Sequence, residues 1–293
     1  MSLMTPSAEN PTALTFTEGE KKALITLLQD EDPEVYESIH QTILDQGPAA
    51  AEWLQGYTLD DDPLLRKRAT AIVDHFERQS ADNGFLGFCL NKSDKIDVER
   101  GAWLLAKTHY CGINTEAYAA VLDNYASELK DRIDFGAPAS QILSTINFYL
   151  YHYLGYCGDM ENYYDPQNSY LNRVVDRLKG NPISLSAVYM FVCKRLHLPV
   201  VGIGMPGHFI CRFQTTREQI YIDPFQKGKL MTKGECIKML LQSGHELHES
   251  FISPVSPRRM LLRMCSNLQH AYSTQDQPEA AQQMQHYIIA LSK

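Results

Sequence analysis

The chain has 293 residues, of which 44% are hydrophobic, so it is long enough to bury a substantial core as one large domain or two closely packed ones. Its 35 acidic residues outnumber its 27 basic residues, which gives a formal net charge of -8. This balance argues against a broad basic surface, and nucleic acid is therefore not an expected partner.

The cysteines, histidines and apolar runs bear on compartment and cofactors. Seven scattered cysteines without C-x-x-C spacing argue against a disulfide framework and a zinc site, and favour a cytoplasmic protein. The ten histidines form no H-x-x-x-H pair with a nearby acid, so neither a metal nor another cofactor is expected. The amino terminus lacks the features of a signal sequence, and no apolar run approaches the roughly 20 residues that span a bilayer. We therefore expect neither secretion nor a membrane anchor.

The first part of the chain, residues 1–139, is expected to be helical. Thr17 and Glu20 form a capping box that predicts a helix start. Pro33, preceded by an aspartate, predicts the start of the next helix, and the same pattern returns 30 residues later at Pro63. This spacing suggests a degenerate helical repeat of the HEAT type, although two ordinary capped helices explain it equally well.

The residue composition of the sequence changes after residue 199. Three short runs rich in β-branched and aromatic residues, 200–204, 208–213 and 219–223, are separated by turn residues and predict an antiparallel meander. Two amphipathic helices follow in 256–293 and resemble one tetratricopeptide-like hairpin. Such a hairpin cannot bury both faces alone, so it must dock on the rest of the chain or on a partner.

The candidate catalytic residues lie between Asn181 and Asp223. Asn181 and Pro182 predict a helix start, which places Ser184 in the first turn. A helix start concentrates unpaired N–H groups and positive potential, and cysteine hydrolases place their nucleophile there. His208 opens one predicted strand and Asp223 closes the next, so antiparallel pairing would bring the imidazole beside the carboxylate. This order is the one that a papain-type or transglutaminase-type triad needs.

Five motifs stand close together in the same region: Tyr163-Tyr164-Asp165-Pro166, Asn168-Ser169-Tyr170-Leu171-Asn172, Gly180-Asn181-Pro182-Ile183-Ser184-Leu185-Ser186, Pro206-Gly207-His208-Phe209 and Tyr221-Ile222-Asp223-Pro224-Phe225. Together they resemble the SirB1 family of transglutaminase-like proteins. The resemblance implies an α+β fold with a papain-like core, whose catalytic histidine and aspartate map onto His208 and Asp223. We accordingly expect a helical region at 1–139, a transglutaminase-like core with an antiparallel sheet at 140–255, and the helical hairpin at 256–293.

The chain departs from active transglutaminases at the nucleophile. Their cysteine would fall near Pro182, and no cysteine lies between Gly158 and Val192. Ser184 carries the nearest hydroxyl, but an alkoxide is much harder to form than a thiolate at neutral pH. The alternative is that Ser184 is a helix-start residue bonded to the backbone.

Other residues are candidates for the cleft. Asn168, Asn172 and Pro182 are candidates to line it, and capping or turn roles are equally natural for the two asparagines. Cys157 would reach the cleft only if its loop folds over it, whereas Cys193 and Cys211 are expected to be buried core thiols.

Three functions follow from these observations. The first is a transglutaminase-like protein without standard cysteine chemistry that binds a peptide or protein in the inherited cleft. The second is an active hydrolase or acyltransferase on amide or peptide bonds that uses Ser184 or a loop cysteine with His208 and Asp223. The third is a helical scaffold with an idle cleft.

Overall fold

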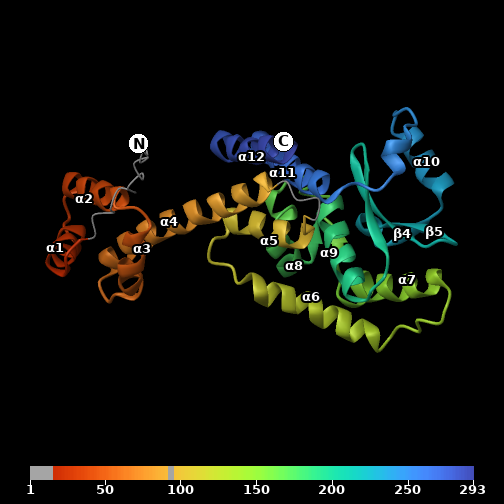
Figure 1. The fold of residues 1–293 in the computed structure, drawn as a ribbon, viewed down its shortest axis with the longest axis horizontal. Helices are drawn as coiled ribbons and strands as arrows, with labels where there is room; N and C mark the ends of the chain where they lie inside the picture. The colour runs from red at the N-terminus through yellow and green to blue at the C-terminus, as the bar shows by residue number, and fades with distance from the viewer. Residues whose placement is uncertain (1–15, 92–95) are drawn as a thin grey trace, which may run out of the picture. The chain divides into compact units, whose positions relative to one another are not determined.

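A computed structural model describes residues 16–91 and 96–293 of the chain (Figure 1). It confirms the expected α+β class, with helices before and after a four-stranded antiparallel sheet. The chain divides into two compact units, Met1–Ala81 and Asp82–Lys293. In the described parts, no helix has the length and apolar character needed to cross a membrane. The amino-terminal residues on which the expectation of no signal sequence rests lie outside the described ranges.

The first unit is helical, and side chains cap the starts of its first two helices. Glu20 accepts the Thr17 N–H at 2.7 Å and Thr17 Oγ accepts the Glu20 N–H at 3.3 Å, so the predicted capping box is confirmed. Asp32 accepts the Glu34 N–H at 2.8 Å and caps the next helix as predicted. The elements are α1 (Glu18–Leu28), α2 (Pro33–Asp45), α3 (Ala49–Leu54), η1 (Gln55–Leu59) and the start of α4 (Pro63–Leu90). Their core buries apolar side chains that include Leu28, Ile43, Leu54, Ile72 and Phe76.

The second unit is built around α9 (Pro182–Arg195), which is buried throughout Pro182–Tyr189. One side of α9 packs on the sheet and other sides pack on α6, α8 and α11. An apolar helix of this kind is stabilised by its surroundings more than by its own propensity. The other helical elements of this unit are α5 (Val98–His109), α6 (Thr115–Lys130), α7 (Ala139–Asn147), η2 (Phe148–Tyr153), η3 (Pro166–Asn168), α8 (Leu171–Arg177), η4 (Pro224–Gln226), α10 (Lys233–Gln242), η5 (Glu249–Ile252), α11 (Pro257–Thr274) and α12 (Pro278–Ser292).

The sheet is a meander with the order β3-β4-β5-β6. Its strands are β3 (Val200–Met205), β4 (His208–Gln214), β5 (Gln219–Asp223) and β6 (Lys229–Met231), all antiparallel to their neighbours. The three predicted strands are confirmed, and the short β6 adds a fourth. Separately, β1 (Cys157–Gly158) pairs in parallel with β2 (Lys179–Gly180), just before α9 begins.

The register of the sheet determines which side chains share a face. Because Cys211 pairs with Ile222, the first residue of β4 and the last residue of β5 lie at the same end of the sheet. Alternation turns Phe209 and Cys211 toward the core that contains α9. His208 pairs with Met205, whose side chain belongs to a separate core cluster on the other face.

The carboxy-terminal helices α11 and α12 pack against each other and run side by side in Figure 1. Helix α11 also packs on α5, α9 and η3. These contacts confirm that the predicted helical pair docks on the rest of its unit. This packing places α11 at the end of the sheet where β4 starts, and Arg263 of α11 bonds to the first residue of β4.

Gly228, between η4 and β6, provides a test of this packing. Its φ is +73°, and a Cβ there would overlap the side chains of Asn147 and Tyr151. We expect Gly228→Ala to lower the free energy of unfolding by about 1 kcal/mol for the left-handed backbone plus roughly 1–3 kcal/mol for overpacking. Urea denaturation measures the loss. Gly244→Ala is the matched control, because Gly244 has φ +79° and open space around its Cβ position. Equal losses in the two variants would contradict the predicted packing.

Candidate functional site

The structure brings His208 and Asp223 together, as the order of the strands predicts. Nε2 of His208 lies 2.8 Å from Oδ2 of Asp223. The Asp223 side chain is fully buried, whereas 19% of the His208 side chain is exposed. The pair therefore has a buried carboxylate and an imidazole that reaches the surface.

Asp223 is held in place by the turn that follows β5. Its Oδ1 accepts the backbone N–H groups of Phe225 at 3.1 Å and Gln226 at 3.2 Å. These bonds cap η4 and leave Oδ2 for the imidazole. Each oxygen of the buried carboxylate thus has partners, so its orientation is fixed.

The bond to Asp223 determines which nitrogen of His208 is left for chemistry. An ionised carboxylate only accepts hydrogen bonds, so Nε2 carries the proton of the neutral imidazole. Nδ1 then has a free lone pair and is the atom that can accept a proton or a hydrogen bond. The preceding Gly207 has φ +68° and open space around its Cβ position, so no side chain obstructs approach there.

Ser184 occupies the first turn of α9 and is fully buried. Its hydroxyl donates to the Asn168 carbonyl at 2.6 Å and accepts the Asn181 N–H at 3.0 Å. Asn181 Oδ1 in turn accepts the Ser184 N–H at 3.0 Å, which completes a reciprocal capping box. The Ser184 hydroxyl is therefore hydrogen-bonded to backbone groups. It is not bonded to His208, whose ring has Asp223 as its only hydrogen-bond partner within the described residues.

The other predicted cleft residues are all buried. Asn168 is fully buried, and its Nδ2 donates to the Asn162 carbonyl at 2.8 Å. Asn172 is buried in α8, and its Oδ1 has no hydrogen-bond partner among the described residues. Pro182 is buried at the first position of α9. None of the three side chains extends into solvent, so a role in the cleft stays a prediction for each.

Arg177 was not predicted from the sequence, although it organises this loop. Its guanidinium forms ion pairs with Asp159 at 3.3 Å and with Asp165 at 3.1 Å. Asp159 is almost fully buried, and such a carboxylate needs a paired charge. The signal in the sequence was the pair of acids on either side of the tyrosines at 163 and 164, which require a cation from elsewhere in the chain.

Most cysteines are unsuited to nucleophilic chemistry. Cys193 and Cys211 are buried as predicted, and burial raises the pKa of both thiols. Burial raises the pKa of Cys236 to about 12. Cys157 is partly exposed in β1, and its neighbour Gly158 lies against the Phe225 ring. The rings of Phe225 and His208 have centroids 6.0 Å apart, so Phe225 lies between the β1 strand of Cys157 and the imidazole.

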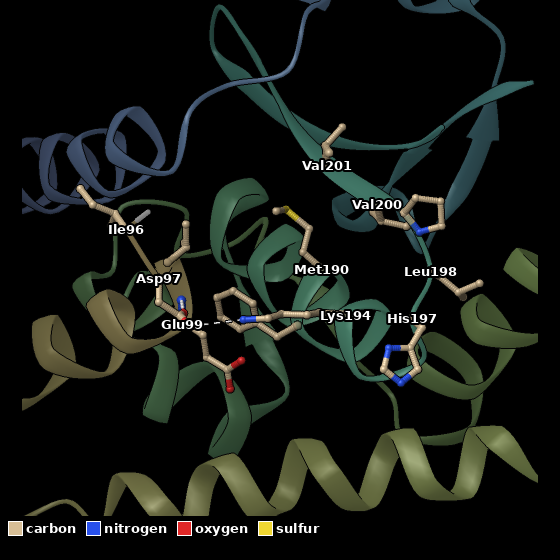
Figure 2. A pocket seen from close by; sticks show the side chains of 12 residues that line it. Ile96, Asp97, Glu99, Met190, Lys194, His197, Leu198, Val200 and Val201 are labelled. Carbon is tan, nitrogen blue, oxygen red and sulfur yellow. Dashed lines mark hydrogen bonds and ion pairs between the residues drawn. The ribbon is translucent and has the colours of Figure 1, made fainter. Parts of the chain in front are cut away.

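A cavity of about 530 Å³ lies at the opposite end of α9 (Figure 2). Figure 2 shows the Lys194 side chain of α9 extending toward Asp97, with which it is paired at 3.2 Å. Met190 of α9 and Val200 and Val201 of β3 also line the cavity. Its lining includes neither His208 nor Asp223. The cavity is therefore separate from the histidine–aspartate pair.

Comparisons with known proteins agree with this architecture. A family described as the transglutaminase-like superfamily matches residues 116–266. A UPF0162 protein of Xylella fastidiosa is 30% identical over 196 residues, which cover 65% of this chain and 70% of the relative. A UPF0162 protein of Pseudomonas aeruginosa is 27% identical over 206 residues, covering 69% and 74% of the two chains. F-box only protein 21 of Mus musculus is 34% identical over 137 residues, which cover 44% of this chain and 21% of that protein. No solved structure matches significantly.

Two variants in the same buried turn of α9 test the role of the Ser184 hydroxyl. Ser184→Ala removes the hydroxyl's bonds to the Asn168 carbonyl and the Asn181 N–H, which keep a direct bond to each other at 3.1 Å, and we expect it to lower the free energy of unfolding by about 1 kcal/mol. Ser186→Ala is the matched control, because Ser186 makes a single longer bond of 3.4 Å to the Phe209 carbonyl. Urea denaturation compares the two. A Ser184→Ala protein as stable as the parent would mean that the hydroxyl is not required by the backbone and is available to His208.

Proposed function

The chain belongs to the transglutaminase-like superfamily, and we propose that it binds a peptide or protein segment beside His208 without standard cysteine catalysis. One observation carries the proposal. The histidine–aspartate pair is retained, while no cysteine lies between Gly158 and Val192 and the Ser184 hydroxyl is bonded to the backbone.

Without a cysteine or a free hydroxyl beside it, the imidazole has no side chain to activate for covalent acyl transfer. Freeing the Ser184 hydroxyl would break its buried hydrogen bonds to the Asn168 carbonyl and the Asn181 N–H, at a cost of about 0.5–1.5 kcal/mol each. The alkoxide would still have to form at neutral pH, where the helix dipole helps a hydroxyl much less than a thiol. The oriented imidazole is instead suited to accept a hydrogen bond at Nδ1 from a backbone N–H of a bound peptide.

Exposed aromatic side chains next to the pair favour a peptide as the ligand. Tyr163 is 36% exposed, and its ring centroid lies 5.9 Å from that of Phe225, the neighbour of His208. Tyr164 is 51% exposed and follows directly. Tyrosine and phenylalanine provide large contact areas together with polar tips, and they are enriched where proteins bind other chains.

The comparison with F-box only protein 21 also supports a binding role. The matched region makes up 21% of F-box only protein 21, so a related sequence occurs as one part of a much longer protein. A domain combined with other sequence in this manner is suited to recognise a partner.

The main alternative is an amide or peptide hydrolase that uses Cys157. The observation that favours it is the partial exposure of this thiol, one residue from the contact between Gly158 and Phe225. Catalysis would require the loop to bring Sγ to Nδ1 of His208. A helical scaffold with an idle cleft is the third possibility.

A mixture of N-acetylated, C-amidated heptapeptides with randomised positions tests the proposal. The immobilised protein should retain a subset of them, measured by mass spectrometry. His208→Ala should reduce retention roughly fivefold, because one hydrogen bond is lost at the site. His197→Ala is the control, since His197 is an exposed histidine at the other end of α9 and should leave retention unchanged.

The same experiment distinguishes the alternatives. Peptide cleavage, or a covalent adduct on Cys157 or Ser184 that disappears in His208→Ala, would establish a hydrolase and refute the proposal. Failure of the parent protein to retain any peptide would refute it in favour of an idle cleft.

A further inference from the structure

Arg263 of α11 carries a half-buried positive charge beside the pair. Its Nη2 donates to the His208 carbonyl at 2.8 Å, and its guanidinium carbon lies 5.8 Å from the centroid of the Phe209 ring. Burial lowers the pKa of Arg263, and the neighbour that opposes this shift is the Tyr163 hydroxyl. Within residues 16–91 and 96–293, Arg263 belongs to no ion pair.

The other partly buried arginines of the same unit are either paired with acids or hydrogen-bonded through both terminal nitrogens. Arg177 pairs with two aspartates, and Arg195 pairs with Glu99 at 2.7 Å and with Asp123 at 2.5 Å. A guanidinium removed from water without a counter-ion is unfavourable unless something compensates it. Arg212 and Arg258 have no acid either, but each donates through both terminal nitrogens. Among the residues described, Arg263 donates through Nη2 alone, so its remaining N–H groups are left for an anion that is not part of the chain.

Arg263 lies on a continuous polar and aromatic face. Arg263, Asn267 and His270 follow each other at spacings of four and three residues, so they share one side of α11. Asn267 and His270 line a small cavity of about 50 Å³ together with Tyr163, Tyr164, Asp165, Ser169, Asn181 and Ala271. The rings of Tyr164 and His270 have centroids 5.0 Å apart. The face therefore runs from His208, past Arg263, to the start of α9.

We propose that Arg263 binds the carboxylate of an aspartate or glutamate side chain in a peptide held beside His208, an inference that rests on the proposed function. A guanidinium offers planar N–H donors that match a carboxylate. One unpaired charge balances a singly charged carboxylate, whereas a phosphate would bring nearly two negative charges. A ligand that contacts both His208 and the cavity beside Asn267 continues past Arg263. The carboxylate is therefore carried by a side chain and not by the end of the peptide.

Because the chain is acidic overall, a preference for acidic peptides would indicate a local cation at the binding site. At -8, the protein does not attract acidic peptides in general. Selection of an acidic residue must then come from a local cation, and Arg263 is the one that contacts the His208 backbone.

Two matched peptide mixtures test the inference. Both consist of N-acetylated, C-amidated heptapeptides with randomised positions, except that the central residue is Glu in one and Gln in the other. The immobilised protein should retain the Glu mixture about tenfold better or more, since the pair adds charge-assisted hydrogen bonds. A Gln mixture with a free carboxyl terminus should gain nothing, because the terminus does not replace the side chain.

Variants assign the preference to its source. Arg263→Gln should abolish the Glu preference, and Arg263→Lys should retain part of it because the charge remains. Arg217→Gln, at an exposed position in the β4–β5 turn, controls for general electrostatics and should keep the preference. Thermal unfolding of each variant shows that it is folded. If Arg263→Gln is unfolded, the comparison of Arg263→Lys with the parent decides, because a purely structural role predicts an unchanged Glu preference.

The outcomes separate this inference from the proposed function. Equal retention of the Glu and Gln mixtures by the parent protein would overturn the role of Arg263 while leaving peptide binding intact. A preference for Glu that persists in Arg263→Gln would overturn it as well. Retention of neither mixture would refute both.

Discussion

The hydrogen bond between His208 and the buried carboxylate of Asp223 is the interaction on which the site depends. A fully buried carboxylate is unfavourable unless its oxygens are occupied, and here η4 occupies one oxygen while the imidazole occupies the other. This arrangement ties the end of β5 to the start of β4. It also directs Nδ1 of His208 away from the carboxylate, and Arg263 braces the same residue through its carbonyl.

The start of α9 is locked by a second set of polar contacts. Ser184, Asn181 and the Asn168 carbonyl satisfy one another in a buried region. In a cysteine enzyme the same helix start would present a thiolate, whereas here it stabilises the loop that carries Tyr163 and Tyr164. The helix start is thus occupied by structural hydrogen bonds, which supports the proposal that the core orients an imidazole without a nucleophile at this position.

Local sequence patterns predicted the helix caps and the strands, because both depend on residues close together in the chain. The caps at Thr17, Asp32 and Asn181 and the strands of the meander follow from residue type and spacing, and the proximity of His208 to Asp223 follows from strand order. Contacts between distant segments carry no such periodic signal. Arg263 meets β4 across 55 residues, so the sequence did not indicate it. The three-residue β6 is too short to show alternation.

The position of the proton on the His208 ring reports on the hydrogen bond to Asp223 and on ligand contact at Nδ1. Long-range ¹⁵N–¹H correlation NMR of the protein, alone and with the peptides that it retains, reports on both ring nitrogens. Our account predicts a proton on Nε2, a bare Nδ1, and a shift confined mainly to Nδ1 when peptide binds. A proton on Nδ1, or ring chemical shifts that do not change when peptide is added, would contradict it.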